Sequence, residues 1–351
     1  MPFKLLHALN TTYCADTVEW CPMVQFNKFF ACGTYELQNE QTKSTRIGQL
    51  HLFSVDEQLQ INLHSTIDTS AILDMKWFSK LINGRILLAT CNADGKVMLW
   101  EFVQGHTDHL TYLSEHQINS ENVISLSIDK SDLTTPQICV SDSQGFLTVL
   151  RLDDKNDFHL LHKVKVNDYE AWIATFSLTN DSVVLTGGDD CFIKVFDLRC
   201  HSHAVNKLEE HQCGVTSLRF NHKNTNILAS GSYDETIKIW DDRIMKNSLS
   251  SCGVGGGVWR IKWSPVNAKH ILTAAMYSGV YELEYSPETH SLRQENEFKE
   301  HESITYGADY CYIPPNELLE NYLKDEPYLD CDGMLTVTCS FYDKKLCLCA
   351  L

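Results

Sequence analysis

The stretch HQCGVTSLRFNHKNTNILASGSYDETIKIWDD, residues 211–242, indicates the architecture of the chain. Apolar and polar side chains alternate in three short runs, separated by turn-forming residues at Asn221–Thr225 and Tyr233–Glu235. Alternation with a period of two is typical of strands that bury one face. The stretch therefore predicts three antiparallel strands joined by two turns.

Four residues of this stretch match the frame of the WD repeat, a β-meander that recurs about every 40–45 residues. They are a histidine before the first strand, a serine in the second, an aspartate in the second turn and a tryptophan in the third: His211, Ser230, Asp234 and Trp240. In WD repeats these side chains often form a buried hydrogen-bond network. Histidine, serine and aspartate also make up a hydrolase triad, but in this frame we interpret them as structural.

Copies of the frame occur along the whole chain. Each has a turn position followed six residues later by a third-strand position, and the turn positions are Ile47, Asp94, Gln144, Asp190, Asp234, Ser278 and Asp343. The first six lie 44–50 residues apart, and the seventh follows after 65. One repeat alone leaves its apolar faces exposed, so the repeats must pack side by side and close into a ring. We predict an all-β fold, a single seven-bladed WD40 β-propeller over residues 1–351.

Three segments fall outside the repeated frame. The last repeat lacks an outer strand, and we predict that Phe3–Leu9 supplies it and closes the ring. Residues 35–46 are polar and predict a mobile hairpin excursion, a polar loop in the first blade. Residues 313–330 predict an insertion in the last blade, with a short helix capped at Asn316.

The composition restricts the partners. The chain has 29 Lys and Arg against 46 Asp and Glu, a formal net charge of −17. This acidity argues against direct binding to nucleic acid or anionic membranes, since both are polyanions. No apolar run approaches the roughly 20 residues that cross a bilayer, and the first residues lack the apolar core of a signal peptide. We expect a cytoplasmic protein, and a monomer because a closed propeller has few free strand edges.

The 14 cysteines are scattered through strand-like runs. They lack the paired spacing of a zinc site, so we expect no metal. A chain of this length buries a core without disulfides. We therefore interpret most cysteines as small buried apolar residues in a reducing compartment.

Residues that depart from the repeat in register indicate a binding surface. Where the quoted repeat has Thr216, three other repeats have an aromatic residue: Trp172, Trp259 and Tyr306. Just before the turn position, four successive repeats have Asp189, Tyr233, Tyr277 and Tyr342. WD propellers commonly bind ligands through these two positions, at one mouth of the channel. We predict an aromatic mouth with Asp189, Glu170 and Asp309 nearby, which suits a cationic group. An ordinary protein-binding surface is the alternative.

Four segments resemble the diphthine methyl ester hydrolase family, WD-repeat proteins also called diphthine methyltransferases. They are YCADTVEWCP (13–22), GGGVWRIKWSP (255–265), EHESITYGADY (300–310) and CSFYDKKLCL (339–348). The resemblance implies a carboxylic ester hydrolase of diphthamide biosynthesis. Its substrate would be the methyl ester on the modified histidine of elongation factor 2, and its products diphthine and methanol. Neither cofactor nor metal is implied. The substrate side chain carries a fixed trimethylammonium group, which suits an acidic, aromatic mouth.

Ester hydrolysis needs a nucleophile or an activated water, a base, and donors to the oxyanion. The chain has no GxSxG elbow, which argues against an ordinary serine esterase. The candidates cluster in two of the family-like segments. We predict His301 as the base, with Ser303 or water as nucleophile. Arg260 would stabilise the oxyanion, with Tyr306 and Asp309 positioning these groups. Arg260 equally fits an anchor for acidic groups of a partner.

A non-catalytic adaptor is the competing class. WDDR at 240–243, echoed by FDLR at 196–199, resembles the short motif of substrate receptors for cullin-type ubiquitin ligases. That motif has low specificity, because Asp and Arg often follow the third strand of a WD repeat. An adaptor would bind elongation factor 2 or another partner without consuming a methyl ester. A methyltransferase is the third possibility, although no donor-binding motif occurs in the sequence.

Overall fold

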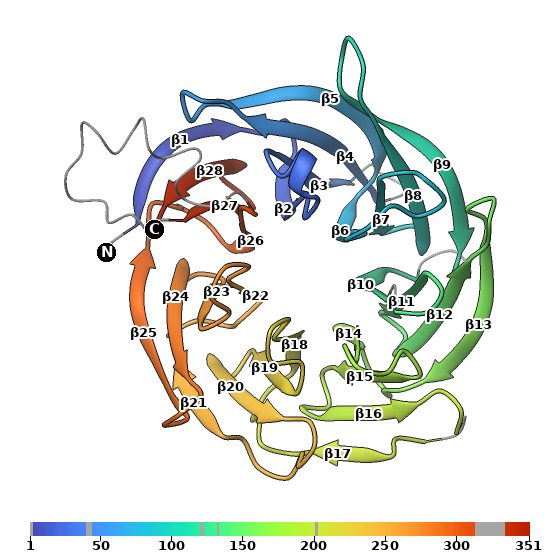
Figure 1. Cartoon of the computed structure of the whole chain (residues 1–351), viewed down its shortest axis with the longest axis vertical. Helices are drawn as coiled ribbons and strands as arrows, with labels where there is room; N and C mark the ends of the chain where they lie inside the picture. Colours follow the sequence, from blue (N-terminus) through green and yellow to red (C-terminus); the bar gives the residue numbers. More distant parts are fainter. Residues whose placement is uncertain (1–2, 40–43, 120–122, 132, 201–202, 313–333) are drawn as a thin grey trace.

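The computed structural model describes residues 3–39, 44–119, 123–131, 133–200, 203–312 and 334–351. Its strands form seven four-stranded antiparallel sheets, arranged as blades around a central channel (Figure 1). This confirms the predicted propeller. A single turn of 3-10 helix, η1 (Val24–Phe26), is the helical element among these residues, and none of their helices is long and apolar enough to cross a bilayer.

Each blade has four strands, which follow one another in order from the innermost, beside the channel, to the outermost, at the rim. The innermost strands are β2 (Cys14–Trp20), β6 (Ile72–Trp77), β10 (Ser125–Ser131), β14 (Ile173–Phe176), β18 (Val215–Phe220), β22 (Arg260–Trp263) and β26 (Thr305–Tyr310). The second strands are β3 (Phe29–Asn39), β7 (Leu87–Asn92), β11 (Gln137–Asp142), β15 (Val183–Gly187), β19 (Ile227–Ser232), β23 (His270–Ala274) and β27 (Leu335–Ser340). The third strands are β4 (Ser44–Val55), β8 (Lys96–Val103), β12 (Phe146–Leu152), β16 (Ile193–Asp197), β20 (Thr236–Asp241), β24 (Val280–Ser286) and β28 (Lys345–Ala350). The outer strands are β5 (Ile61–Ser70), β9 (His109–Gln117), β13 (Phe158–Lys165), β17 (Asn206–Leu208), β21 (Ser250–Gly253), β25 (Ser291–Phe298) and β1 (Lys4–Asn10).

The N-terminal strand closes the ring, as predicted. β1 pairs antiparallel with β28, from Lys4 opposite Ala350 to Asn10 opposite Lys345. The last blade therefore contains both the first and the last strand of the chain (Figure 1).

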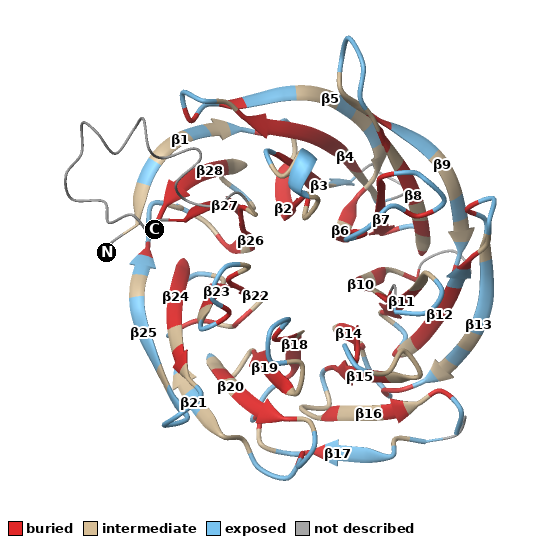
Figure 2. Ribbon diagram, viewed as in Figure 1, coloured by how far each residue is buried: buried red, intermediate tan, exposed pale blue. Residues whose placement is uncertain are grey.

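The core lies between neighbouring blades. Inner and middle strands are buried, whereas outer strands alternate between exposed and partly buried residues (Figure 2). In one cluster Trp20 and Phe30 of the first blade pack with Val337 and Leu348 of the last. Most cysteines of the described residues are buried and all are free thiols, in agreement with their interpretation as apolar core residues.

The first blade differs from the expected pattern. β3 and β4 continue into the polar segment 35–46 as a long hairpin, with Glu36 opposite Ile47 and Asn39 opposite Ser44. Ile47 therefore lies inside β4 rather than at a turn, because the hairpin is longer than in other blades. The predicted insertion 313–330 lies outside the described residues.

Candidate functional site

The WD network of the fifth blade forms as predicted. His211 Nδ1 lies 2.8 Å from Asp234 Oδ2, and its Nε2 lies 2.7 Å from Ser230 Oγ. Trp240 Nε1 donates to the same Ser230 hydroxyl at 2.8 Å. Both nitrogens of the imidazole are therefore engaged between strands, which is a structural role.

His301, predicted as the catalytic base, occupies the corresponding place in the last blade. Its Nδ1 lies 2.7 Å from Ser340 Oγ and its Nε2 lies 2.8 Å from Thr338 Oγ1, and the Ser340 hydroxyl bonds to Asp343. Burial lowers the pKa of His301 to about 4. Ser303, the predicted nucleophile, accepts a hydrogen bond from the Tyr342 backbone N–H at 3.0 Å. These contacts repeat the structural network and leave neither ring nitrogen open to a substrate.

We therefore expect His301→Ala to act on stability rather than on chemistry. Loss of a network that satisfies two buried hydroxyls should lower the free energy of unfolding by about 1–3 kcal/mol. His211→Ala is the matched control and should behave alike. Denaturant unfolding of both variants, with activity measured well below the midpoint, tests this. A large loss of activity confined to His301→Ala would restore its assignment as the base.

One position near the start of each inner strand faces a single mouth of the channel. In five strands this residue is the extra one of a β-bulge, and in β14 and β22 it immediately precedes the strand. The seven residues are Asp16, Leu73, Leu126, Trp172, Thr216, Trp259 and Tyr306. Bulges re-aim a side chain out of the sheet. The predicted register among Trp172, Thr216, Trp259 and Tyr306 is thus correct.

The aromatic residues of the mouth form a continuous wall. Ring centroids lie 5.6 Å apart for Trp172 and Trp259, 6.1 Å for Tyr233 and Trp259, and 4.9 Å for Trp259 and Tyr306. Phe341 extends the row at 5.4 Å from Tyr306. We call Trp172, Tyr233, Trp259, Tyr306 and Phe341 the aromatic wall.

The remaining predicted mouth residues border this wall. Trp172 Nε1 donates to Asp189 at 2.5 Å, so that carboxylate lies beside the rings. Burial, with the charges of Asp189 and Glu170, raises the pKa of Tyr233 to about 12. Tyr277 and Tyr342 are 81% and 69% exposed, and the ring of Tyr342 contacts Phe341 at 5.0 Å. Large exposed aromatics beside a wall of this kind are typical of recognition surfaces.

A buried group of charges lies next to the wall. Arg260 Nη1 is 3.1 Å from Asp74 Oδ1, and Asp74 also accepts from Lys76 at 2.9 Å. Burial by itself would raise the pKa of Asp74, but Arg260 and Lys76 outweigh it and hold the pKa at about 2. Asp16 is 6% exposed, and among the described residues its carboxyl has no hydrogen-bond partner. Its burial, reinforced by Asp74, raises the pKa of Asp16 to about 8 although Arg260 opposes the shift.

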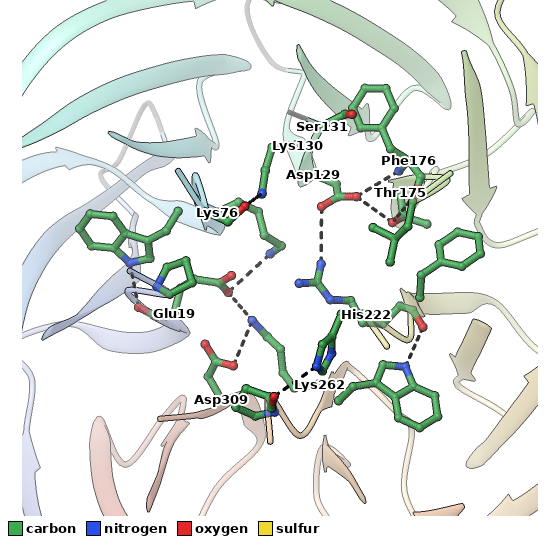
Figure 3. A pocket seen from close by; sticks show the side chains of 18 of the residues that line it. Glu19, Lys76, Asp129, Lys130, Ser131, Thr175, Phe176, His222, Lys262 and Asp309 are labelled. Carbon is green, nitrogen blue, oxygen red and sulfur yellow. Dashed lines mark hydrogen bonds and ion pairs between the residues drawn. The ribbon is translucent and has the colours of Figure 1, made fainter. Parts of the chain in front are cut away.

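Asp309 lies deeper in the channel than predicted. It follows Tyr306 by three residues on β26, about 10 Å along the strand, and pairs with Lys262 at 3.4 Å. There it lines a cavity at the far end of the channel, together with Arg219 and with the side chains labelled in Figure 3 as Glu19, Lys76, Asp129, Thr175 and Lys262. The cavity measures about 470 Å³. Asp309 is therefore not placed to position a substrate at the aromatic wall.

The sequence interpretation missed Asp16, Asp74 and Phe341. Asp16 stands in register with Tyr306, but the long hairpin of the first blade displaces the turn that would have aligned it. Phe341 directly precedes Tyr342, and the alignment used only the second of the pair. No group of three His, Cys, Asp or Glu side chains suited to a metal occurs in the part of the chain that the structure describes.

Comparison with known proteins places the chain in a family. Residues 202–241 match the family model of the WD domain, G-beta repeat. The diphthine methyltransferase of Mus musculus is 33% identical, over 88% of this chain and 70% of its own length. The diphthine methyltransferase homolog of Dictyostelium discoideum is 30% identical, over 95% of this chain and 95% of its own length. The chain belongs to the diphthine methyltransferase family.

The fold of this diphthine methyltransferase family member has a solved counterpart. A chain in the crystal structure of the mitotic checkpoint complex superposes with a TM-score of 0.70, covering 99% of this chain and 91% of its own. The two sequences are 14% identical, so the likeness shows the propeller alone. Family membership rests on the sequence relatives, and it confirms the resemblance drawn from the four segments.

Proposed function

We propose that this protein hydrolyses the methyl ester of methylated diphthine on elongation factor 2, giving diphthine and methanol. The relatives are named for a modification of diphthine. The observation that carries the proposal is the aromatic wall, bordered by Asp189 and by the carboxyl group of Asp16. Aromatic rings and carboxylates together attract a quaternary ammonium group.

The wall would hold the trimethylammonium group and leave the ester facing the buried charges. The ring of Trp259 lies edge-to-face with Trp172 and tilted against Tyr306, so the three rings adjoin and one cation could contact more than one of them. Asp189 is fixed by Trp172 and adds negative charge at the border. The ester carbonyl then lies toward Arg260 and the Tyr306 hydroxyl.

Two donors would stabilise the oxyanion that forms when water attacks the ester. Arg260 is cationic and held in place by Asp74. Burial raises the pKa of Tyr306, so its hydroxyl keeps the proton it would donate. Donors held in place before the reaction contribute strongly to ester hydrolysis. His301 and Ser303 have no part in this arrangement, because both are bonded within the last blade.

The test is a mass measurement on elongation factor 2 that carries methylated diphthine. Incubation with the purified protein, without added cofactor, should lower the mass by about 14 Da, one methylene equivalent. Trp259→Ala should raise KM by about tenfold or more, because a cation–π contact contributes roughly 0.5–2 kcal/mol and the wall is interrupted at its centre. Trp259→Phe is the control and should keep most of the affinity.

The other outcomes separate the competing functions. A mass increase of about 14 Da that requires an added methyl donor would identify a methyltransferase. Binding of elongation factor 2 with no change in mass would favour a non-catalytic adaptor. Either result would refute the esterase.

A further inference from the structure

We propose that Asp16 is the general base of the hydrolysis, and that a cation bound at the aromatic wall converts it to its active, ionised form. This inference rests on the proposed function. It assigns a role to a residue that lies in the family-like segment 13–22 but is not among the site residues predicted from the sequence.

The position of Asp16 suits such a role. It is the extra residue of the β-bulge between Ala15 and Thr17 on β2, in the same register as Tyr306 on the neighbouring β26. The other six residues of this register are aromatic, aliphatic or threonine, so Asp16 is the one carboxyl group at that level of the described mouth. The side chain is largely buried and makes no hydrogen bond within the described residues, yet its carboxyl oxygens are not among the unpartnered atoms that are closed off from solvent. A water molecule can therefore reach the carboxyl group, as a general base requires.

The charge of Arg260 acts on two carboxyl groups, Asp74 and Asp16. Arg260 forms its ion pair with Asp74, which stays ionised, and the same Asp74 charge opposes a second negative charge on Asp16. As a result the two pKa values differ, with about 2 for Asp74 and about 8 for Asp16. Carboxyl pairs separated in this way commonly divide into a permanent anion and a group that exchanges protons.

The other groups that face Asp16 do not exchange protons near neutral pH. They are the phenol of Tyr306 on β26 and the thiols of Cys32 on β3 and Cys339 on β27. Burial raises the pKa of all three above the ordinary value, so each remains neutral. Asp16 is therefore the group whose charge responds to a ligand at the wall.

A fixed positive charge at the wall favours the carboxylate form of Asp16. By linkage, a cation that lowers this pKa must bind more tightly when Asp16 is already ionised, and must release a proton when it is not. The substrate would thus ionise its own base on binding, while the empty site keeps a neutral acid.

The reaction balances with water alone. The Asp16 carboxylate takes a proton from water as the water oxygen bonds to the ester carbon, and the carbonyl electron pair moves onto oxygen. The intermediate collapses, the bond from the carbonyl carbon to the methoxy oxygen breaks, and the leaving oxygen takes the proton from Asp16. Methanol and a carboxylic acid result, and the acid loses its proton to solvent.

The first experiment uses tetramethylammonium as probe and needs no turnover. Its affinity for the wild-type protein, measured by calorimetry from pH 6 to pH 9, should rise with pH and level off near pH 8. Asp16→Asn should bind it with an affinity that is flat over this range. The control is Asp154→Asn, an exposed carboxylate in the turn after β12, which should behave as wild type.

The second experiment measures turnover of the methylated elongation factor 2. For the wild type, kcat/KM should rise about tenfold per pH unit below pH 8, while the rise in kcat should lie at lower pH because bound substrate favours ionised Asp16. Asp16→Asn should lower kcat by about 10²–10⁴-fold and should abolish the increase of kcat and kcat/KM with pH. Asp16→Glu keeps the carboxyl group and should recover part of the rate and part of its pH dependence. This recovery would show that the loss in Asp16→Asn is not due to misfolding.

The outcomes distinguish the two proposals. If the wild type hydrolyses the ester and a folded Asp16→Asn keeps its kcat within about threefold, the role of Asp16 is overturned and the esterase stands. If tetramethylammonium binding by the wild type does not change with pH, the coupling is overturned. If the wild type does not hydrolyse the ester, both proposals fall.

Discussion

Asp74→Asn is expected to lower the free energy of unfolding by about 3–5 kcal/mol, the typical cost of leaving a buried charge without its partner. Met75 and Ile128 donate backbone N–H groups to Oδ1 and Oδ2 of Asp74, respectively. Asparagine keeps the shape of the side chain, but its single oxygen can accept only one of these two bonds. The change therefore removes the negative charge that faces Arg260 and Lys76, together with one backbone hydrogen bond. Two buried cations then remain with too few anions.

Denaturant unfolding at pH 7 measures this effect. The control is Glu284→Gln, which breaks an ion pair with Arg293 at the surface, where Arg293 is 68% exposed. A surface pair of this kind contributes about 0–1 kcal/mol. An Asp74→Asn variant as stable as Glu284→Gln would show that the buried group does not stabilise the fold. The double variant with Asp16→Asn should be less stable than Asp74→Asn alone, because Asp16 and Glu19 are then the acidic groups whose charges act on Arg260.

Deletion of residues 1–10 is expected to lower Tm by about 10 °C. The deletion removes all of β1 and exposes the edge of β28. It also removes Leu6 and Leu9 from the core between the first and last blades, and Phe3 from its contact with Phe298 at 5.7 Å. Burial of one such side chain stabilises by roughly 1.5–3 kcal/mol when complete, so three partly buried ones amount to about 5 kcal/mol. The shift is about 2–4 °C per kcal/mol for domains of about 150–250 residues and is smaller for larger ones. At about 2 °C per kcal/mol, a loss of that size corresponds to a shift of about 10 °C.

Calorimetry on the deleted protein tests this, with a peptide of residues 1–10 added back as the control. A peptide that re-forms β1 should recover part of the lost Tm in a concentration-dependent way, because a ligand that binds the folded state stabilises it. If the protein without residues 1–10 has the same Tm as the intact protein, β1 contributes little to closure of the ring.

The fold could be predicted from the sequence because the repeat signal is local. His211, Ser230, Asp234 and Trp240 lie within one blade and bond to each other as the frame predicts. The mouth residues Trp172, Trp259 and Tyr306 were found by counting from the same frame. The method failed where the spacing changes, in the first blade, and it therefore missed Asp16.

The depth of each side chain in the channel could not be predicted in the same way. Tyr306 and Asp309 are neighbours in the sequence, yet one lies at the mouth and the other lines the far cavity. His301 was assigned by its nearness to these residues along the chain, whereas its partners Thr338 and Ser340 follow almost forty positions later. Contacts of that range depend on which strands pair, and the residue types alone do not specify them.

The pairing of β1 with β28 has a consequence for biosynthesis. β1 is translated before the other described strands, and its partner β28 is translated after them. Until β28 is made, β1 has no edge to join, and the apolar flanks of the first and seventh blades face water. Six blades can assemble during translation, but the closing one cannot. A nascent chain stalled before β28 is therefore an incomplete ring with exposed apolar surfaces. A protein truncated there by a premature stop codon should be bound by chaperones and degraded by proteases rather than persist as a less active enzyme.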